Sequence, residues 1–267
     1  MGIPAFDYLR PSSLAEARKA YEASGEARYI AGGQTLLPVM KQRLAQPAAL
    51  IDLGGIADLS GIRVEGDKLT IGAMTRHADV AASPDVRRLI PALAHLAGLI
   101  GDPQVRNRGT MGGSLANNDP SADYPAAILG LGASILTDSR SIAADDFFDG
   151  LFTTALEEGE IIRAISFPAP ERAAYEKFAH PASRFALVGV MVSKGTAGVR
   201  VAATGAGQGG VFRVPEMESA LGKSFSAKAI EGIKVPADDM IADMHAPAAY
   251  RAQLVGVLAR RAVAAIA

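Results

Sequence analysis

The stretch VRNRGTMGGSLANNDPSADYP, residues 105–125, concentrates glycine, asparagine and aspartate in a chain that is otherwise rich in alanine and other apolar residues. Such clusters are typical of turns, so a plain turn is one interpretation. The other is a binding loop, because small residues leave backbone N–H groups free to surround an anion. The residues that would form this nest are Thr110, Met111, Gly112, Gly113 and Ser114. Asn117 and Asp123 follow them, with side chains that can hydrogen-bond hydroxyl groups.

A second glycine-containing stretch, YIAGGQTLLPVMK, covers residues 29–41. Its pattern predicts a short strand, two glycines, a polar pair and the start of a helix. Free N–H groups and the helix dipole at such a junction favour a bound anion. The pattern Gly-x-x-x-x-Gly-Lys-Ser/Thr is missing, which excludes an NTP-binding P-loop. A tight strand-to-helix turn with Thr35 as N-cap is an equally supported alternative. The two stretches together would suit a diphosphate held without lysines.

Composition limits the class of protein. The 267 residues are 49% hydrophobic and 21% charged, which is ordinary for a folded protein of one large domain or two. A net charge of −1 without any Lys/Arg-rich run argues against a nucleic-acid partner. Neither a long apolar run nor a signal-peptide pattern is visible, so we expect a cytoplasmic protein without a membrane span. The lack of cysteine excludes disulfides, thiolate nucleophiles and iron–sulfur ligation within this chain.

Helix-like and strand-like segments alternate along the chain as far as Pro168-Ala169-Pro170, which we interpret as a boundary. Strand-like segments follow it, and then three helix-like segments near residues 216–221, 226–233 and 248–267. Strands followed by helices predict an α+β unit of about a hundred residues, a common size for a second domain.

The remaining motifs offer little chemistry. Residues 205–210, GAGQGG, match the dinucleotide pattern Gly-x-Gly-x-x-Gly, but we expect Pro215 to prevent the helix that this fingerprint requires. The four histidines show no metal-ligand spacing, and no catalytic carboxylate pair or Ser–His–Asp arrangement can be identified. No side chain is therefore predicted to break bonds unaided.

The two glycine stretches, AGGQTLLPVMK (31–41) and VRNRGTMGGSLANNDPSADYP, resemble the flavin-binding segments of the medium, FAD-carrying subunit of molybdenum hydroxylases. This is the carbon monoxide dehydrogenase and xanthine dehydrogenase family. GEIIRAISFP (159–168), YEKFAHPASRFALVGV (175–190) and the final α+β unit are also similar. The resemblance implies an α+β fold. A two-lobed FAD-binding domain of the vanillyl-alcohol-oxidase (PCMH) type would cover residues 1–170, and a small α+β C-terminal domain would cover 171–267.

The resemblance also assigns roles to individual residues. The first stretch would wrap the FAD diphosphate with Ala31, Gly32, Gly33, Gln34, Thr35 and Leu36. The second cradle would consist of Thr110, Gly112, Gly113 and Ser114, with Asn117 nearby. Asp123 would fix the ribose or adenine end, Ile100 and Ile162 would pack against apolar parts of FAD, and Lys177 aligns with a lysine near the flavin in larger relatives. Gln34 departs from the family pattern, because relatives often carry His there.

The resemblance further implies a function, most like that of the carbon monoxide dehydrogenase medium subunit. In this family electrons leave the substrate at a molybdenum cofactor, cross two [2Fe–2S] clusters and reach FAD, which reduces NAD, a quinone or oxygen. The chain would be the FAD-carrying relay, with the clusters on a small partner subunit and molybdopterin on a large one, in a dimer of heterotrimers. Two alternatives remain: a self-sufficient flavin oxidase of the same fold, and a non-enzymatic nucleotide-binding or assembly module. The substrate and the terminal acceptor do not follow from the sequence.

Overall fold

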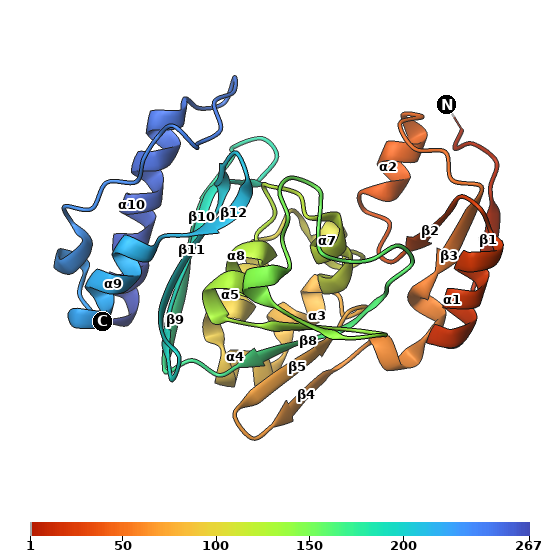
Figure 1. The fold of residues 1–267 in the computed structure, drawn as a ribbon, viewed down its shortest axis with the longest axis horizontal. Coiled ribbons are helices and arrows are strands. Elements are labelled where there is room, and N and C mark those ends of the chain that lie inside the picture. Colours follow the sequence, from red (N-terminus) through yellow and green to blue (C-terminus); the bar gives the residue numbers. More distant parts are fainter. Residues whose placement is uncertain (1) are drawn as a thin grey trace.

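The computed structural model describes residues 2–267. They form three β-sheets that follow one another along the chain, with helices packed between and outside them (Figure 1). The N-terminal part, which we call the first lobe, contains a parallel sheet in the order β1-β3-β2. Its elements are β1 (Asp7–Leu9), α1 (Leu14–Ala23), β2 (Ala27–Ile30), α2 (Leu36–Lys41) and β3 (Ala49–Asp52), followed by short 3-10 helices at Leu53–Gly55 and Ala57–Leu59.

The middle of the chain forms the second lobe, built on an antiparallel sheet in the order β4-β5-β8-β6-β7. Its strands are β4 (Ile62–Glu65), β5 (Lys68–Gly72), β6 (Ser134–Thr137), β7 (Ser141–Ala143) and β8 (Ile162–Pro168), with a 3-10 helix at Ala144–Asp146. Its helices are α3 (His77–Ala82), α4 (Pro84–Leu89), α5 (Pro91–Leu99), α6 (Pro103–Arg106), α7 (Met111–Asn117) and α8 (Tyr124–Leu131). Proline stands in the first turn of α4, α5, α6 and α8, where its fixed φ suits the helix and no N–H is needed.

The last part of the chain, which we call the C-terminal unit, contains an antiparallel sheet in the order β12-β11-β10-β9. Its elements are β9 (Arg172–Ala179), β10 (Ala186–Gly195), β11 (Gly198–Gly207), β12 (Gly210–Arg213), α9 (Pro215–Lys223), a 3-10 helix at Ala227–Ile230 and α10 (Ala248–Ile266). The predicted order of strands followed by helices is confirmed, although residues 226–233 hold only the short 3-10 helix.

The C-terminal sheet is covered on both faces. One face continues the main hydrophobic core of the second lobe through Tyr175, Met191 and Ala202, and α5 and α8 pack there. The other face forms a separate core with α9 and α10. Burial on both faces explains why the first eight residues of β10 are all buried. The sheet is thus a shared wall between the second lobe and the last helices.

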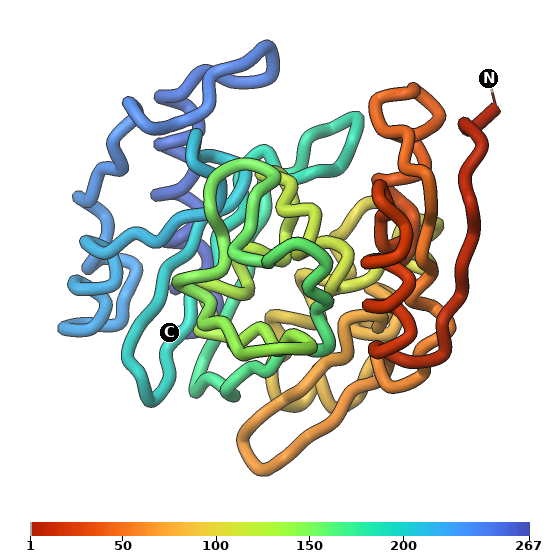
Figure 2. The backbone as a smooth tube through the Cα atoms, turned by 45° about the vertical axis from the view of Figure 1, so that its right-hand side comes forward, coloured from red at the N-terminus to blue at the C-terminus, as the bar shows by residue number. Residues whose placement is uncertain are grey.

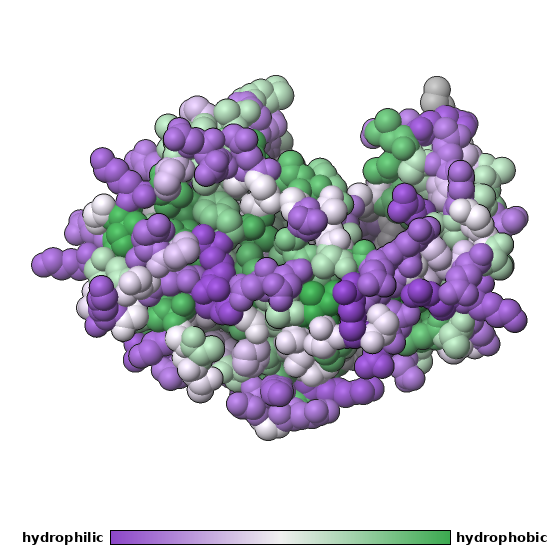
Figure 3. All heavy atoms as spheres, in the orientation of Figure 1, coloured by the Kyte–Doolittle hydropathy of each residue, from purple (hydrophilic) through white to green (hydrophobic). Residues whose placement is uncertain are grey.

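The first lobe packs around its own small core at the opposite end of the molecule from α10 (Figure 2). Between the first lobe and the C-terminal unit the surface is hollowed, as the space-filling view in Figure 3 shows. Among residues 2–267, no helix has both the length and the apolar character needed to cross a membrane.

Candidate functional site

The two glycine-containing stretches lie against each other in the structure. We call residues 31–36 the first loop and residues 108–114 the second loop. A Cβ atom added to Gly32 would lie 2.2 Å from the carbonyl oxygen of Arg108 and 2.8 Å from the Cα atom of Gly109. A Cβ atom added to Gly113 would lie 3.4 Å from the Cβ atom of Ala31. Only glycine at position 32 allows this approach, and it brings the two predicted stretches together.

The first loop connects β2 to α2 and exposes a run of backbone donors. Gly33 has a φ of +72°, in the left-handed region that favours glycine. Within residues 2–267, no acceptor bonds the N–H groups of residues 32–36. Thr35 stands at the N-cap position of α2, as the strand-to-helix turn predicts, but its side chain makes no capping hydrogen bond to the helix. Five successive free donors of this kind suit the oxygen atoms of a phosphate group.

The second loop differs from the nest that its composition predicts. The N–H of Met111 donates to the carbonyl of Thr75 (3.1 Å), and the N–H of Gly112 donates to that of Ala73 (2.8 Å). The following two N–H groups bond the side chain and the carbonyl of Thr110. The expectation of free N–H groups is therefore wrong for these four residues, because the chain between β5 and α3 supplies two of the acceptors and Thr110 supplies the other two.

What the second loop provides instead is a close-packed surface of small residues. A Cβ atom added to Gly112 would lie 2.5 Å from the Cβ atom of Ala73 beneath it. Ser114 and Asn117, both half-buried on α7, donate to and accept from no other group of the described chain through their side chains. The hydroxyl of Ser114 and the amide of Asn117 are thus available to hydrogen-bond a ligand.

Asp123 and Lys177 form a buried ion pair between α8 and β9. Nζ of Lys177 lies 2.9 Å from Oδ2 of Asp123, and the hydroxyl of Tyr175 donates to Oδ1 at 2.6 Å. Burial raises the pKa of Asp123 above its usual range, while the charge of Lys177 and the Tyr175 hydroxyl oppose that shift. Asp123 stands at the N-cap position of α8, but its side chain makes no hydrogen bond to the first N–H groups of that helix.

The two predicted apolar contacts occupy different places. Ile100 follows α5 and is half-buried, and the carbonyl of its neighbour Leu99 accepts a hydrogen bond from Lys177 (3.1 Å). Ile100 therefore lies beside the Asp123–Lys177 pair. Ile162 begins β8 and is buried in the core of the second lobe. The contacts of these residues with a cofactor stay predictions.

His77 supports the second loop, although nothing in the sequence singled it out. Its backbone N–H donates to the carbonyl of Gly109 (3.0 Å), and a Cβ atom on Gly109 would lie 2.5 Å from its Nε2. Burial, and secondarily the charge of Arg106, lowers the pKa of His77 to about 4. The imidazole is therefore neutral under physiological conditions. Its contact with Gly109 depends on tertiary folding, so no local sequence pattern could identify this role.

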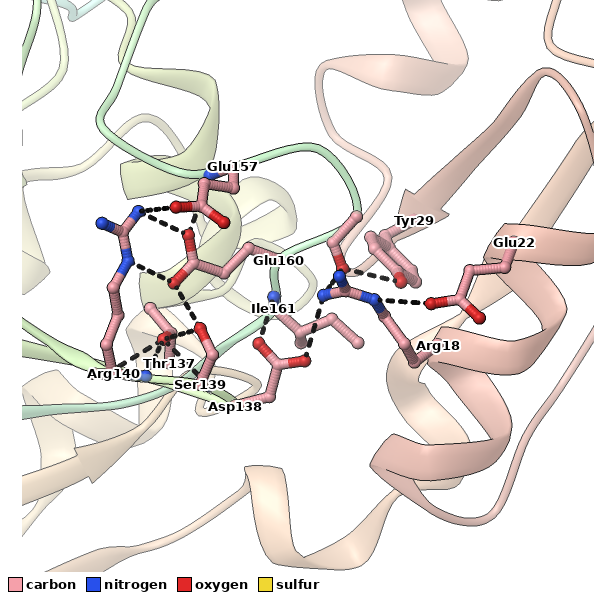
Figure 4. A network of polar contacts seen from close by, with 11 residues as sticks. Arg18, Glu22, Tyr29, Thr137, Asp138, Ser139, Arg140, Glu157, Glu160 and Ile161 are labelled. Carbon is pink, nitrogen blue, oxygen red and sulfur yellow. Dashed lines mark hydrogen bonds and ion pairs between the residues drawn. The ribbon is translucent and has the colours of Figure 1, made fainter.

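A polar network joins the first lobe to the second lobe (Figure 4). Arg18 on α1 and the hydroxyl of Tyr29 on β2 both donate to the carbonyl of Gly159, each at 3.1 Å. Arg18 also approaches Asp138, which follows β6, at 3.6 Å. The rings of Tyr21 and Tyr29 stack with centroids 4.9 Å apart. We call Arg18, Tyr29, Asp138 and Gly159 the lobe clasp, because it fixes the lobes that carry the two loops relative to each other.

The glycine run at residues 205–210 is part of a hairpin. It ends β11, turns and begins β12, with Gly207 paired to Gly210. The expected exclusion of a dinucleotide fold holds, but the reason given for it is wrong. Pro215 does not prevent a helix; it occupies the first turn of α9, where proline is well tolerated. The described residues also contain no cluster of three or more His, Asp or Glu side chains able to hold a metal ion.

A loop of free backbone donors, closed by a second glycine loop where two lobes meet, defines a protein that binds a phosphate-bearing cofactor. Residues 4–170 match the family described as the FAD binding domain in molybdopterin dehydrogenase. The chain belongs to this family, as an FAD-binding subunit of a molybdenum hydroxylase. The first loop fits the expected group, because FAD carries a diphosphate.

Known relatives match almost the whole chain. The nicotine 6-hydroxylase medium subunit of Paenarthrobacter nicotinovorans is 37% identical over 276 residues, covering 98% of both chains. The carbon monoxide dehydrogenase medium chain of Hydrogenophaga pseudoflava is 37% identical over 280 residues, covering 97% of this chain and 96% of the relative. The solved structure of that organism's carbon monoxide dehydrogenase, which lacks the Mo-pyranopterin moiety, superimposes with a TM-score of 0.89 at 38% identity over 99% and 98% of the two chains.

These matches confirm the predicted fold, cofactor and class of activity. The chain is an FAD-carrying electron-transfer subunit of an oxidoreductase, and this interpretation is favoured over a self-sufficient oxidase or a nucleotide-binding module.

Proposed function

We propose that this chain accepts electrons from [2Fe–2S] clusters on a small partner subunit and passes them through FAD to a terminal acceptor. A large subunit with the molybdenum cofactor completes the assembly, a dimer of heterotrimers. The names of the two relatives described above support this proposal, since one is called a medium subunit and the other a medium chain. The lack of cysteine supports it as well, because the clusters must then reside on another chain.

The observation that carries the proposed site is the run of free N–H groups at residues 32–36. We infer that Ala31, Gly32, Gly33, Gln34, Thr35 and Leu36 hold the FAD diphosphate through these donors. Thr110, Gly112, Gly113, Ser114 and Asn117 flank it from the second loop. Gly112 lets the loop pack closely, while the Ser114 hydroxyl and the Asn117 amide are free to donate.

The remaining proposed contacts lie toward the C-terminal unit. Ile100 packs against an apolar part of FAD, and Lys177 faces the cofactor from beside Ile100. Both oxygen atoms of Asp123 already have partners within the chain. Its proposed role is therefore to position Lys177, with a ribose or adenine contact as a second task. FAD supplies the redox chemistry when bound, and these residues bind and orient it.

We also propose that the boundary between two domains lies at residue 170, with the FAD-binding domain over 1–170 and the C-terminal domain over 171–267. The C-terminal sheet begins directly after this point, at Arg172, and gains its second core from α9 and α10. The other face of this sheet packs against the second lobe, so the two domains share one continuous hydrophobic core.

Two measurements test the proposed function. The purified chain, incubated with FAD and then gel-filtered, retains flavin absorbance. A [2Fe–2S] protein encoded in a neighbouring gene, reduced in advance and freed of reductant, then bleaches this absorbance under anaerobic conditions. Loss of FAD on the column would contradict the site. The proposed relay would be contradicted if the chain retained FAD but the reduced [2Fe–2S] protein did not reduce it. Oxidation of a substrate by the chain alone would also contradict it.

A further inference from the structure

Leu151 and Phe152 form an exposed apolar projection on the second lobe. Their exposed fractions are 42% and 60%, respectively, on a chain whose other large apolar side chains are mostly buried. Phe152 has a φ of +56°, a left-handed conformation that bulky side chains rarely adopt. A strained backbone at an exposed aromatic residue is maintained by its surroundings, and such strain is typical of functional positions.

Asn118 is the residue that holds this projection in place. It is 2% exposed, and its Nδ2 donates to the carbonyls of Gly150 (2.9 Å) and Thr153 (2.6 Å). Its own carbonyl accepts the N–H of Phe152 at 3.1 Å. Three hydrogen bonds from one buried residue thus fix both ends and the centre of the turn. The two apolar side chains are presented rigidly rather than left on a mobile loop.

Asn118 also connects the projection to the proposed cofactor site. It is the left-handed C-cap of α7, the helix that begins in the second loop. Seven helical residues rise only about 10 Å, so the projection borders the cofactor-binding segment. A protein that delivers electrons to FAD has to dock on a surface next to that segment.

A hollow lies directly beside the projection. A cavity of about 430 Å³ opens between the β11–β12 turn and residues 235–240. Apolar side chains line much of it, among them Phe212, Val235 and Met240. Gly210 joins the two features, because a Cβ atom there would lie 3.1 Å from the carbonyl of Gly150. An exposed apolar projection next to an apolar hollow is a surface shape expected at a protein-binding site.

The charges around this surface are acidic. Asp149 precedes the projection, and Glu216 and Asp239 line the hollow, all three exposed and without an ion-pair partner in the described chain. The basic residue of the hollow, Arg213, is already paired with Glu218 and Asp145. A complementary partner therefore carries basic side chains around an apolar socket.

We propose that Leu151 and Phe152 are the anchor with which this chain docks its [2Fe–2S] electron-donor subunit. The inference rests on the proposed function and adds the surface at which the donor binds. The donor offers an apolar socket with a basic rim, and an apolar side chain of the donor enters the hollow. Buried aromatic anchors of this type dominate the binding energy of protein interfaces.

The decisive variant is Phe152→Gly, which removes the ring and relieves the left-handed strain. A glycine at this φ leaves the melting temperature unchanged or raises it. We expect the affinity for the [2Fe–2S] protein from the neighbouring gene to fall at least tenfold, with unchanged FAD content. A merely structural Phe152 would give the opposite result, a lower melting temperature with normal affinity, and would overturn the proposal.

Leu44→Ser is the matched control, because Leu44 is 75% exposed but lies on the first lobe. Leu44→Ser leaves the affinity for the [2Fe–2S] protein unchanged.

The proposal is also overturned if Phe152→Gly binds the [2Fe–2S] protein normally but loses binding to the large subunit or loses self-association. If the unmodified chain retains FAD but binds no [2Fe–2S] protein, the proposed function itself fails. If it binds the protein and Phe152→Gly binds equally well, only the docking assignment fails.

Discussion

Lys177 on β9 donates a hydrogen bond to Asp123 at the start of α8, and the two side chains are only 3% and 4% exposed. This ion pair is a buried polar contact within the apolar interface between the second lobe and the C-terminal sheet, where Thr204 also donates to the carbonyl of Ala122. Charges are expensive to bury unless they are paired, so each residue depends on the other. Because Leu99 accepts a further bond from Lys177, the pair also sets the end of α5 beside Ile100.

Removing one partner of this pair destabilises the protein. Lys177→Met leaves a buried carboxylate without its cation, and we expect the free energy of unfolding to fall by about 3 kcal/mol. Asp123→Asn leaves the ammonium group unpaired and has a comparable effect. The double variant loses clearly less than the sum of the two, which urea denaturation of the FAD-free chain measures. Additive losses would contradict the coupling.

The contact between the two loops predicts a loss of cofactor from Gly32→Ala. The added methyl group would overlap the Arg108 carbonyl and push the second loop away from the first. We expect FAD retention after gel filtration to fall at least tenfold. Gly98→Ala on α5 is the control, because nothing lies within 4 Å of its added Cβ atom and alanine favours the helix. Equal FAD content in both variants would rule out the loop-to-loop assignment.

The order of helices and strands was largely predictable, because it depends on local patterns. Pro84 and Pro91 stand in the first turns of α4 and α5, where proline is favoured, and Gly66 turns the hairpin between β4 and β5. Pro215 shows the limit of such reasoning. Proline interrupts the interior of a helix but is favoured in its first turn. Pro215 begins α9 just after β12, and only the end of that strand shows that the first turn falls at Pro215.

The candidate site was predictable as two motifs, but not in its hydrogen bonds. The second loop looked like a nest because its residues are small. Two of its N–H groups donate to the carbonyls of Ala73 and Thr75, which tertiary folding brings to it, and two more bond Thr110 within the loop. The partner of Asp123 could not be found either, since 54 residues separate it from Lys177 and no local pattern relates them. Contacts across sheets and lobes depend on topology, which the residue pattern alone does not specify.

His77 predicts an acid dependence of stability. Its pKa is about 4 in the folded chain, against about 6.5 when unfolded, so the unfolded state binds the extra proton between these values. The contribution of the neutral His77 to the free energy of unfolding is complete above pH 6.5. It is lost as the pH falls toward 4, by up to about 3 kcal/mol. Replacing it by Gln flattens this part of the curve of unfolding free energy against pH. An unchanged slope in the Gln variant would contradict the assignment.

The lobe clasp predicts that a change outside both loops speeds the release of FAD. Tyr29→Phe keeps the ring on Tyr21 but removes one donor to the Gly159 carbonyl. Losing this hydrogen bond costs about 1 kcal/mol, so the lobes separate more readily and FAD dissociates about fivefold faster. Stopped-flow recovery of flavin fluorescence measures the rate. Arg88→Met breaks an exposed ion pair within α4, does not touch the lobe contact and leaves the rate unchanged. An unchanged rate for Tyr29→Phe would show that the two loops hold FAD without help from the clasp.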